Sequence, residues 1–240
     1  MIGNKKILVV VPARGGSKGI KLKNIQSING VPLVAMTGQV VKELEIIDRA
    51  IVSTDHEEIA KVAKENGLDV PFLRPEYLSG DRIGDLEVLE HALTEMEKQD
   101  NTIYDIVVML QPTSPSRTAK HVSETICKLI ETDADSVWTL SLTDSKAHPY
   151  KQLIIDNDEI GYYDKEGANI IARQQLTPTY HKNGIAYAIT RDCILNQKSI
   201  KGKKCVPLLI DEYVSNIDTE LDIAFAEFLI TYNKNYNTSI

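Results

Sequence analysis

The stretch ILVVVPARGGSKGIKLKN, residues 7–24, decides the fold of this 240-residue chain. Its first five residues, Ile7–Val11, are all β-branched or leucine, which indicates a strand buried on both faces. Pro12 ends the strand, and the loop after it carries three glycines and four cations: Gly15, Gly16, Gly19, Arg14, Lys18, Lys21 and Lys23. Glycines let backbone N–H groups approach an anion and the cations neutralise it, so the loop predicts a polyphosphate site. The spacing matches neither GxxxxGK(S/T) nor GxGxxG, and a solvated basic loop is the alternative.

Strand and helix patterns alternate as far as residue 142. Short apolar runs predict strands over residues 50–53, 70–73, 106–110 and 136–142. Apolar residues at helical spacing predict helices over residues 32–44, 59–67, 85–98, 122–130 and 221–232. This alternation predicts an α/β fold, with a mostly parallel sheet and helices on both faces. Such sheets bind ligands beyond the carboxyl ends of their strands, so we expect the site in the loops after Val11, Ser53, Leu73 and Leu110.

Residues 144–190 depart from this alternation. Strand-like pieces occur around Ile154–Ile155 and over residues 185–189, joined by polar turns and without a clear helix. We interpret the segment as an arm inserted into a single domain of residues 1–240, and we expect it to pack against a second subunit. Leu208–Ile210 is then expected to return to the sheet.

The composition narrows the possible functions. Hydrophobic residues make up 42% and charged residues 25% of the chain, as in an ordinary globular protein. A net charge of −7 argues against binding to nucleic acid or anionic membranes, although it allows a local basic pocket. The apolar run near the N-terminus is too short for a signal sequence or a membrane span, and the three cysteines lie far apart without a zinc-binding spacing. We therefore expect a reduced, cytoplasmic protein.

Several segments together resemble one family. The loop ARGGSKG, followed closely by LKN, is similar to the cytidylyltransferases that activate acylneuraminate-type sugars. Further similar segments occur in the same order along nearly the whole chain: IVSTDHEEIAKVA (51–63), LRPEYLSGD (73–81), LQPTSPSR (110–117), HPYK (148–151), RQQL (173–176), NGIAY (183–187) and NIDTELD (216–222). The resemblance implies a Rossmann-like sheet of the nucleotide-diphospho-sugar transferase type, with a small dimerisation arm in a homodimer.

The resemblance also implies a reaction. The family transfers CMP from CTP to the anomeric hydroxyl of a sialic-acid-like 2-keto-3-deoxy sugar acid, with Mg²⁺ as cofactor and pyrophosphate as the second product. Legionaminate, pseudaminate or octulosonate are alternative substrates. A nucleotide-binding regulatory protein that has kept the fold is the alternative outside the enzymes.

Matching positions suggest a nucleotide site. The expected nucleotide-binding residues are Arg14, Ser17, Lys18, Lys23, Asn24, Arg74 and Asp85. Arg14 and Lys23 match phosphate contacts, and Arg74 matches an arginine that selects cytosine. Asp85 stands where several members have a serine, so a helix cap is its alternative role, and a strand-end ion pair is the alternative for Arg74.

The remaining matches suggest sugar, catalytic and metal residues. The expected sugar-binding residues are Gln111, Arg173, Tyr180 and Lys182, and the expected catalytic residues are Arg173 and Lys23. Family members often carry DxD before the last helix as Mg²⁺ ligands; here Asn216 replaces the first aspartate and Asp218 keeps the second. The alternative is that Asp218 or Thr219 only caps the last helix.

Overall fold

The computed structural model of the chain describes residues 4–236, with side chains described as far as residue 232. The chain forms two compact units. The main unit holds residues 4–139, 183–208 and 214–236, and the second unit holds residues 140–182 and 209–213. No helix among the described residues is long and apolar enough to cross a membrane.

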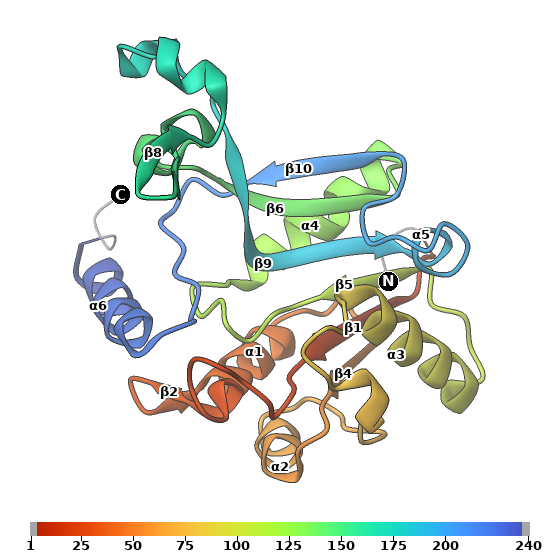
Figure 1. Cartoon of the computed structure of the whole chain (residues 1–240). Helices are drawn as coiled ribbons and strands as arrows, with labels where there is room; N and C mark the ends of the chain where they lie inside the picture. The colour runs from red at the N-terminus through yellow and green to blue at the C-terminus, as the bar shows by residue number, and fades with distance from the viewer. Residues whose placement is uncertain (1–3, 237–240) are drawn as a thin grey trace. The chain divides into compact units, whose positions relative to one another are not determined.

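A six-stranded sheet runs through the chain in the order β10-β6-β9-β5-β1-β4 (Figure 1). The strands are β1 (Ile7–Pro12), β4 (Arg49–Ser53), β5 (Ile106–Met109), β6 (Ser136–Leu142), β9 (Tyr180–Thr190) and β10 (Cys205–Leu209). β1 is parallel to both of its neighbours, β4 and β5, whereas β9 runs antiparallel to β5. The expected mostly parallel α/β fold is therefore confirmed, and the reversed strand β9 is a feature that the sequence pattern did not indicate.

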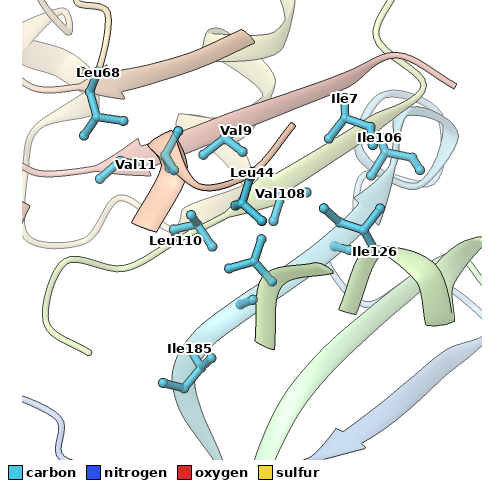
Figure 2. Packing of buried hydrophobic residues seen from close by; sticks show 14 of the residues in the cluster. Ile7, Val9, Val11, Leu44, Leu68, Ile106, Val108, Leu110, Ile126 and Ile185 are labelled. Carbon is cyan, nitrogen blue, oxygen red and sulfur yellow. The ribbon is translucent and has the colours of Figure 1, made fainter. Parts of the chain in front are cut away.

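The alternation of side chains along β1 divides the core into two layers. Ile7, Val9 and Val11 pack with helices α1 (Leu33–Lys42), α2 (Glu57–Glu65) and α4 (Ala119–Thr132). Figure 2 shows part of this layer. Leu8 and Val10 point to the other face, where they pack with α3 (Asp85–Asp100) and α5 (Arg191–Leu195). All five side chains are fully buried, as expected for a central parallel strand with helices on both faces.

A third, smaller cluster joins the glycine-rich loop to the last helix. The hairpin of β2 (Ser27–Ile28) and β3 (Val31–Pro32) follows the 3₁₀ helix η1 (Lys23–Ile25). Helix α6 (Glu220–Tyr236) packs against this hairpin, and the buried members of the cluster are Ile20, Ile28, Leu33, Ile217 and Ala226. The loop after β1 and the segment before α6 are thereby held side by side, although they are about two hundred residues apart.

One predicted strand is wrong. Residues 70–73 form no strand, and only Asp69 makes a bridge to Ile51 of β4. Pro71 cannot donate a backbone hydrogen bond to the sheet edge, so pairing stops there. The chain instead enters a 3₁₀ helix, η2 (Glu76–Leu78), and Arg74 lies in the irregular segment before it.

The second unit contains an exposed hairpin. β7 (Leu153–Asp156) and β8 (Glu159–Tyr162) pair antiparallel through a two-residue turn, in which Asn157 and Asp158 both have positive φ. The unit also holds four 3₁₀ helices: η3 (Ser145–Ala147), η4 (Pro149–Lys151), η5 (Lys165–Asn169) and η6 (Arg173–Gln175). Its described residues form no α-helix, and the sequence pattern over residues 150–190 indicated none.

Candidate active site

A cleft of about 600 Å³ lies in the main unit, where β1 and β5 reach their carboxyl ends. Its lining comes from five stretches that are distant in sequence: the loop after β1, Arg74, the start of α3, the loop after β5, and the segment before α6. Ten predicted site residues line it: Arg14, Ser17, Lys18, Lys23, Asn24, Arg74, Asp85, Gln111, Asn216 and Asp218. The fold thus brings the nucleotide and metal candidates together at the edge of the sheet where α/β proteins bind ligands.

Hydrogen bonds and one close backbone approach fix the path of the glycine-rich loop. The backbone N–H of Gly15 donates to Oδ1 of Asp55 at 2.7 Å, and the Asn24 side-chain amide donates to the carbonyl of Arg14 at 2.9 Å. A Cβ atom at Gly19 would collide with the backbone oxygen of Asp218, so only glycine lets the loop pass this closely to the segment before α6. Asn24 therefore braces the loop in this structure, and Asp55 takes one of the loop's backbone donors.

Three cations of the loop are paired with carboxylates. Nη1 of Arg14 lies 2.8 Å from Oδ1 of Asp81, and Nζ of Lys18 lies 3.1 Å from Oδ2 of the same residue. Nζ of Lys23 lies 2.8 Å from Oδ1 of Asp218. The hydrogen bonds from Lys18 and Arg14 lower the pKa of the exposed Asp81 carboxyl. The loop thus gathers three cations, whose charge the carboxylates of Asp81 and Asp218 partly offset.

Arg74 is held in a buried position beside the same cleft. It is only 6% exposed; its Nε donates to Oγ of Ser53 at 3.0 Å, and its Nη2 donates to the Ser53 carbonyl. Burial lowers the pKa of Arg74 to about 10, an effect that the nearby charge of Asp55 opposes, so the group stays cationic at neutral pH. The guanidinium is anchored by neutral oxygens, which differs from the strand-end ion pair considered as its alternative.

Helix α3 begins at the cleft. Gly84 is its N-cap residue, and Asp85 is its first helical residue. Ile83, Gly84 and Asp85 all line the cleft. The exposed N–H groups and the dipole of a helix N-terminus favour an anion nearby.

A buried arginine organises the loop after β5. The Arg117 guanidinium donates to the carbonyls of Gln111, Gly184 and Ile185, and its Nη1 donates to Oγ1 of Thr37 at 3.1 Å. This places Gln111 at the cleft wall. Arg117 was not predicted as a structural or site residue, because no local pattern distinguishes a buried arginine from a solvated one.

The segment before α6 presents two oxygen-bearing side chains to the cleft. Ile217 is fully buried, and its N–H donates to the Thr113 carbonyl at 2.9 Å. Its neighbours Asn216 and Asp218 are exposed and line the cleft. The burial of the central residue thus pins the segment with its two polar neighbours at the cleft.

The cap of α6 does not use the Asp218 carboxylate. One oxygen of Asp222 accepts from the backbone N–H groups of Asp218 and Thr219 at 2.9 and 2.7 Å. Oγ1 of Thr219 in return accepts from the Asp222 N–H at 3.4 Å, which completes a reciprocal cap. A capping role is therefore filled by Thr219 and Asp222, as one alternative allowed, and the Asp218 carboxylate pairs with Lys23 instead.

The donors at the cleft suit Mg²⁺ only in part. Asn216 and Asp218 offer one amide and one carboxylate oxygen, the hard ligands that Mg²⁺ prefers. Across residues 4–232, however, no three His, Cys, Asp or Glu side chains gather as a metal cluster. Such a pair fits an ion that takes its other ligands from substrate phosphates and water.

The other predicted residues belong to the second unit. Arg173 is the exposed first residue of η6, and Tyr180 and Lys182 lie at the start of β9. The residues that line the cleft all belong to the main unit. The sugar-binding and catalytic roles of these three residues stay predictions.

The fold and the cleft define an α/β protein whose ligand site lies at the carboxyl ends of its central strands. A solved structure of a CMP:2-keto-3-deoxy-manno-octonic acid synthetase in complex with CTP superposes with a TM-score of 0.72 at 15% identity, over 95% of this chain and all of that one (100%). At this identity the likeness concerns the fold.

Sequence comparison gives the family. The chain matches the cytidylyltransferase family over residues 8–236, and it belongs to that family. CMP-N,N'-diacetyllegionaminic acid synthase of Campylobacter jejuni is 32% identical over 228 residues, which are 94% of this chain and 95% of the relative. N-acylneuraminate cytidylyltransferase of Escherichia coli is 30% identical over 223 residues, 92% of this chain and 51% of the relative. The similarity to enzymes named for two different acids is nearly equal.

Proposed function

We propose that this cytidylyltransferase transfers CMP from CTP to the anomeric hydroxyl of a sialic-acid-like 2-keto-3-deoxy sugar acid and releases pyrophosphate. The observation that carries the proposal is the cleft at the carboxyl ends of β1 and β5, where three cations of a glycine-rich loop gather. A triphosphate is the ligand for which such a concentration of positive charge is suited. The names of the relatives support a nonulosonic acid as the acceptor.

The nucleotide is held by residues of the main unit. Arg14, Lys18 and Lys23 bind the phosphates, and Ser17 and Asn24 keep the loop in place around them. Arg74 presents a fixed, buried guanidinium that reads the cytosine. Asp85 contacts the nucleotide from the start of α3.

Mg²⁺ is the proposed cofactor. When bound by Asp218, Asn216, phosphate oxygens and water, it would shield the charge that develops on the pyrophosphate leaving group. Lys23 lies within reach of the same region, since its ammonium contacts Asp218. Lys23 therefore stabilises the negative charge of the phosphates as the bond to the α-phosphorus breaks.

The acceptor side of the site is assigned to different residues. Gln111 orients the sugar from the wall of the cleft. Arg173 binds the sugar carboxylate through its planar guanidinium and orients the anomeric hydroxyl for attack on the α-phosphate, while Tyr180 and Lys182 contact the rest of the sugar. The proposed active protein is a homodimer.

An assay of pyrophosphate release tests the function. The enzyme is given CTP with N-acetylneuraminate, a diacetylated legionaminate, a pseudaminate or an octulosonate, and with UTP or ATP in place of CTP. We expect release with CTP and one of the nonulosonic acids. Lys23→Ala, which removes a charged contact to the phosphates, should be about 30- to 1000-fold slower and so reports any contaminating activity.

Each outcome of this assay separates two functions. If the enzyme prefers legionaminate or pseudaminate, the reaction is the same but the acceptor is a different nonulosonic acid. If it prefers octulosonate, the acceptor is the shorter acid. CTP binding without release for any acid would instead support a nucleotide-binding regulatory protein. Equal turnover with UTP or ATP would contradict the assignment of Arg74 to cytosine.

A further inference from the structure

Asp81 engages two of the cations that the proposed function assigns to the phosphates of CTP. Its two carboxylate oxygens lie 2.8 Å from Nη1 of Arg14 and 3.1 Å from Nζ of Lys18. A single carboxylate therefore contacts two cationic residues that are four positions apart in the glycine-rich loop. Such a contact holds both cations in place and at the same time uses the hydrogen-bond donors that an incoming phosphate needs.

The position of Asp81 allows it to leave these cations readily. It lies at the tip of a turn in which the Ile83 N–H donates to the Gly80 carbonyl at 3.3 Å. Residues 80 and 84, on the two sides of the turn, are glycines. They have no side chains that could pack against neighbouring residues and hold the turn. The Asp81 side chain is 48% exposed, and its described bonds are those to Arg14 and Lys18.

The other carboxylates near the loop differ from Asp81. Asp55 accepts the backbone N–H of Gly15, which fixes the path of the loop rather than the position of a cation. Asp218 pairs with Lys23 and faces the cleft from the segment before α6, where it is the proposed Mg²⁺ ligand. Asp81 alone among these three pairs with two phosphate-binding candidates and has no other proposed task.

We propose that Asp81 is a positioning residue that holds Arg14 and Lys18 at the cleft and competes with the phosphates of CTP for them. The inference rests on the proposed phosphate-binding role of these cations. A polyphosphate carries several negative charges and more acceptor oxygens than a carboxylate, so it displaces Asp81. The displaced carboxylate stays on a neighbouring turn and repels the bound phosphates, so Asp81 weakens nucleotide binding while it keeps the cations aligned.

Replacing Asp81 should therefore tighten phosphate binding, which is the opposite of what loss of a binding or structural residue does. The test is isothermal titration of the wild type and Asp81→Asn with CTP, inorganic pyrophosphate and cytidine, all without metal. We expect the dissociation constants for CTP and pyrophosphate to fall about three- to tenfold in Asp81→Asn, as for removal of one partly solvated like charge, and that for cytidine to stay unchanged.

Asp69→Asn is the matched control. Asp69 also pairs with an arginine, since its Oδ2 lies 3.2 Å from Nη1 of Arg49. Arg49 is the first residue of β4, and neither member of this pair lines the cleft. The variant changes the net charge of the protein by the same amount, and its affinities should equal those of the wild type. In a Lys18→Gln background, Asp81→Asn should lower the dissociation constants for CTP and pyrophosphate by a smaller factor. One of the two cations for which Asp81 and the phosphates compete is then gone.

Unchanged or weaker binding of pyrophosphate by Asp81→Asn would overturn the inference, and so would an equal gain for cytidine. Pyrophosphate carries no base, so it tests Asp81 even where CTP proves to be the wrong nucleotide. A wild type that binds pyrophosphate but releases none from CTP with any acid in the magnesium-containing assay would refute the proposed function, and the pyrophosphate titrations would still decide the role of Asp81. A wild type that binds neither pyrophosphate nor CTP would refute the inference.

Discussion

At the scale of single residues, Asp218 and Asp222 make different contacts although they are only four positions apart. Asp222 completes the reciprocal cap of α6 with Thr219, whereas the Asp218 carboxylate lies at the cleft and contacts Lys23. The Asp218 side chain is 72% exposed and that of Lys23 is 19% exposed, and an ion pair with one partner in solvent contributes little to stability. Function and stability can therefore be separated by substituting the two aspartates one at a time.

Asp218→Asn should nearly abolish turnover and leave the urea midpoint almost unchanged, because it removes the negative charge of the proposed metal ligand and turns one partly exposed ion pair into a neutral contact. Asp222→Asn should lower the free energy of unfolding by about 1 kcal/mol through loss of the cap, with activity kept in the folded fraction. Asn216→Asp should be tolerated and should lower the Mg²⁺ concentration needed for half-maximal rate. An inactive Asp222→Asn beside an active Asp218→Asn would contradict this division. Unfolding curves and magnesium titrations measure both effects.

At this scale the expected site residues came from the resemblance to the family, and ten of them line one cleft. Asn216 and Asp218, for example, lie within four residues of the start of α6, and Gln111 lies two residues after the end of β5. The sequence did not predict the partners of those residues. The pairing of Arg14 with Asp81 spans 67 positions and depends on how two loops fold toward each other, which no local pattern encodes.

At the element scale, Arg117 ties three elements together. Its guanidinium reaches Thr37 on α1, the Gln111 carbonyl after β5, and two carbonyls at the start of the buried part of β9. Arg117 is 5% exposed, and burial without a carboxylate partner among the described residues lowers its pKa. The charge is instead solvated by neutral oxygens, which would lose their donors if the guanidinium were removed.

Arg117→Met should therefore destabilise the protein by about 3–5 kcal/mol, since the carbonyls of Gln111, Gly184 and Ile185 each lose a donor in the interior. Thr37→Val, which removes only the hydroxyl that accepts from Nη1, should cost about 1 kcal/mol. The loss of stability in Arg117→Lys should lie between those of the other two variants. An ammonium cannot reach all four oxygens that accept hydrogen bonds from the planar guanidinium. Urea unfolding of the three variants measures these differences. A loss in Arg117→Met no larger than that in Thr37→Val would show that the arginine is not the clamp.

Elements with strong periodicity were predictable, and those set by non-local pairing were not. The apolar spacing over residues 85–98 predicted α3 almost to its observed end at Asp100. The apolar run over residues 70–73 resembled a strand, but Pro71 and the position at the sheet edge prevent pairing there. The reversed direction of β9 depends on the path of the chain before it, and strand composition does not reveal that path.

At the scale of the whole molecule, the hairpin of the second unit bears on assembly. Ile155 and Ile160 are directly paired across β7 and β8 and are 77% and 73% exposed. A two-stranded hairpin is marginally stable alone, and exposed apolar side chains of this size favour burial against another surface. The sequence predicted such an arm from the interrupted alternation, and the resemblance to the family supplied the expectation of a homodimer.

The wild type should therefore scatter light at about twice the chain mass of 26.8 kDa at micromolar concentration. Ile155→Lys places a charge on the apolar face of the hairpin and should raise the dissociation constant of the dimer by about tenfold or more. Ile103→Lys is the matched control, since Ile103 is 62% exposed but belongs to the main unit. A monomeric wild type would refute the dimer, and equal dissociation in both variants would refute the hairpin as its contact.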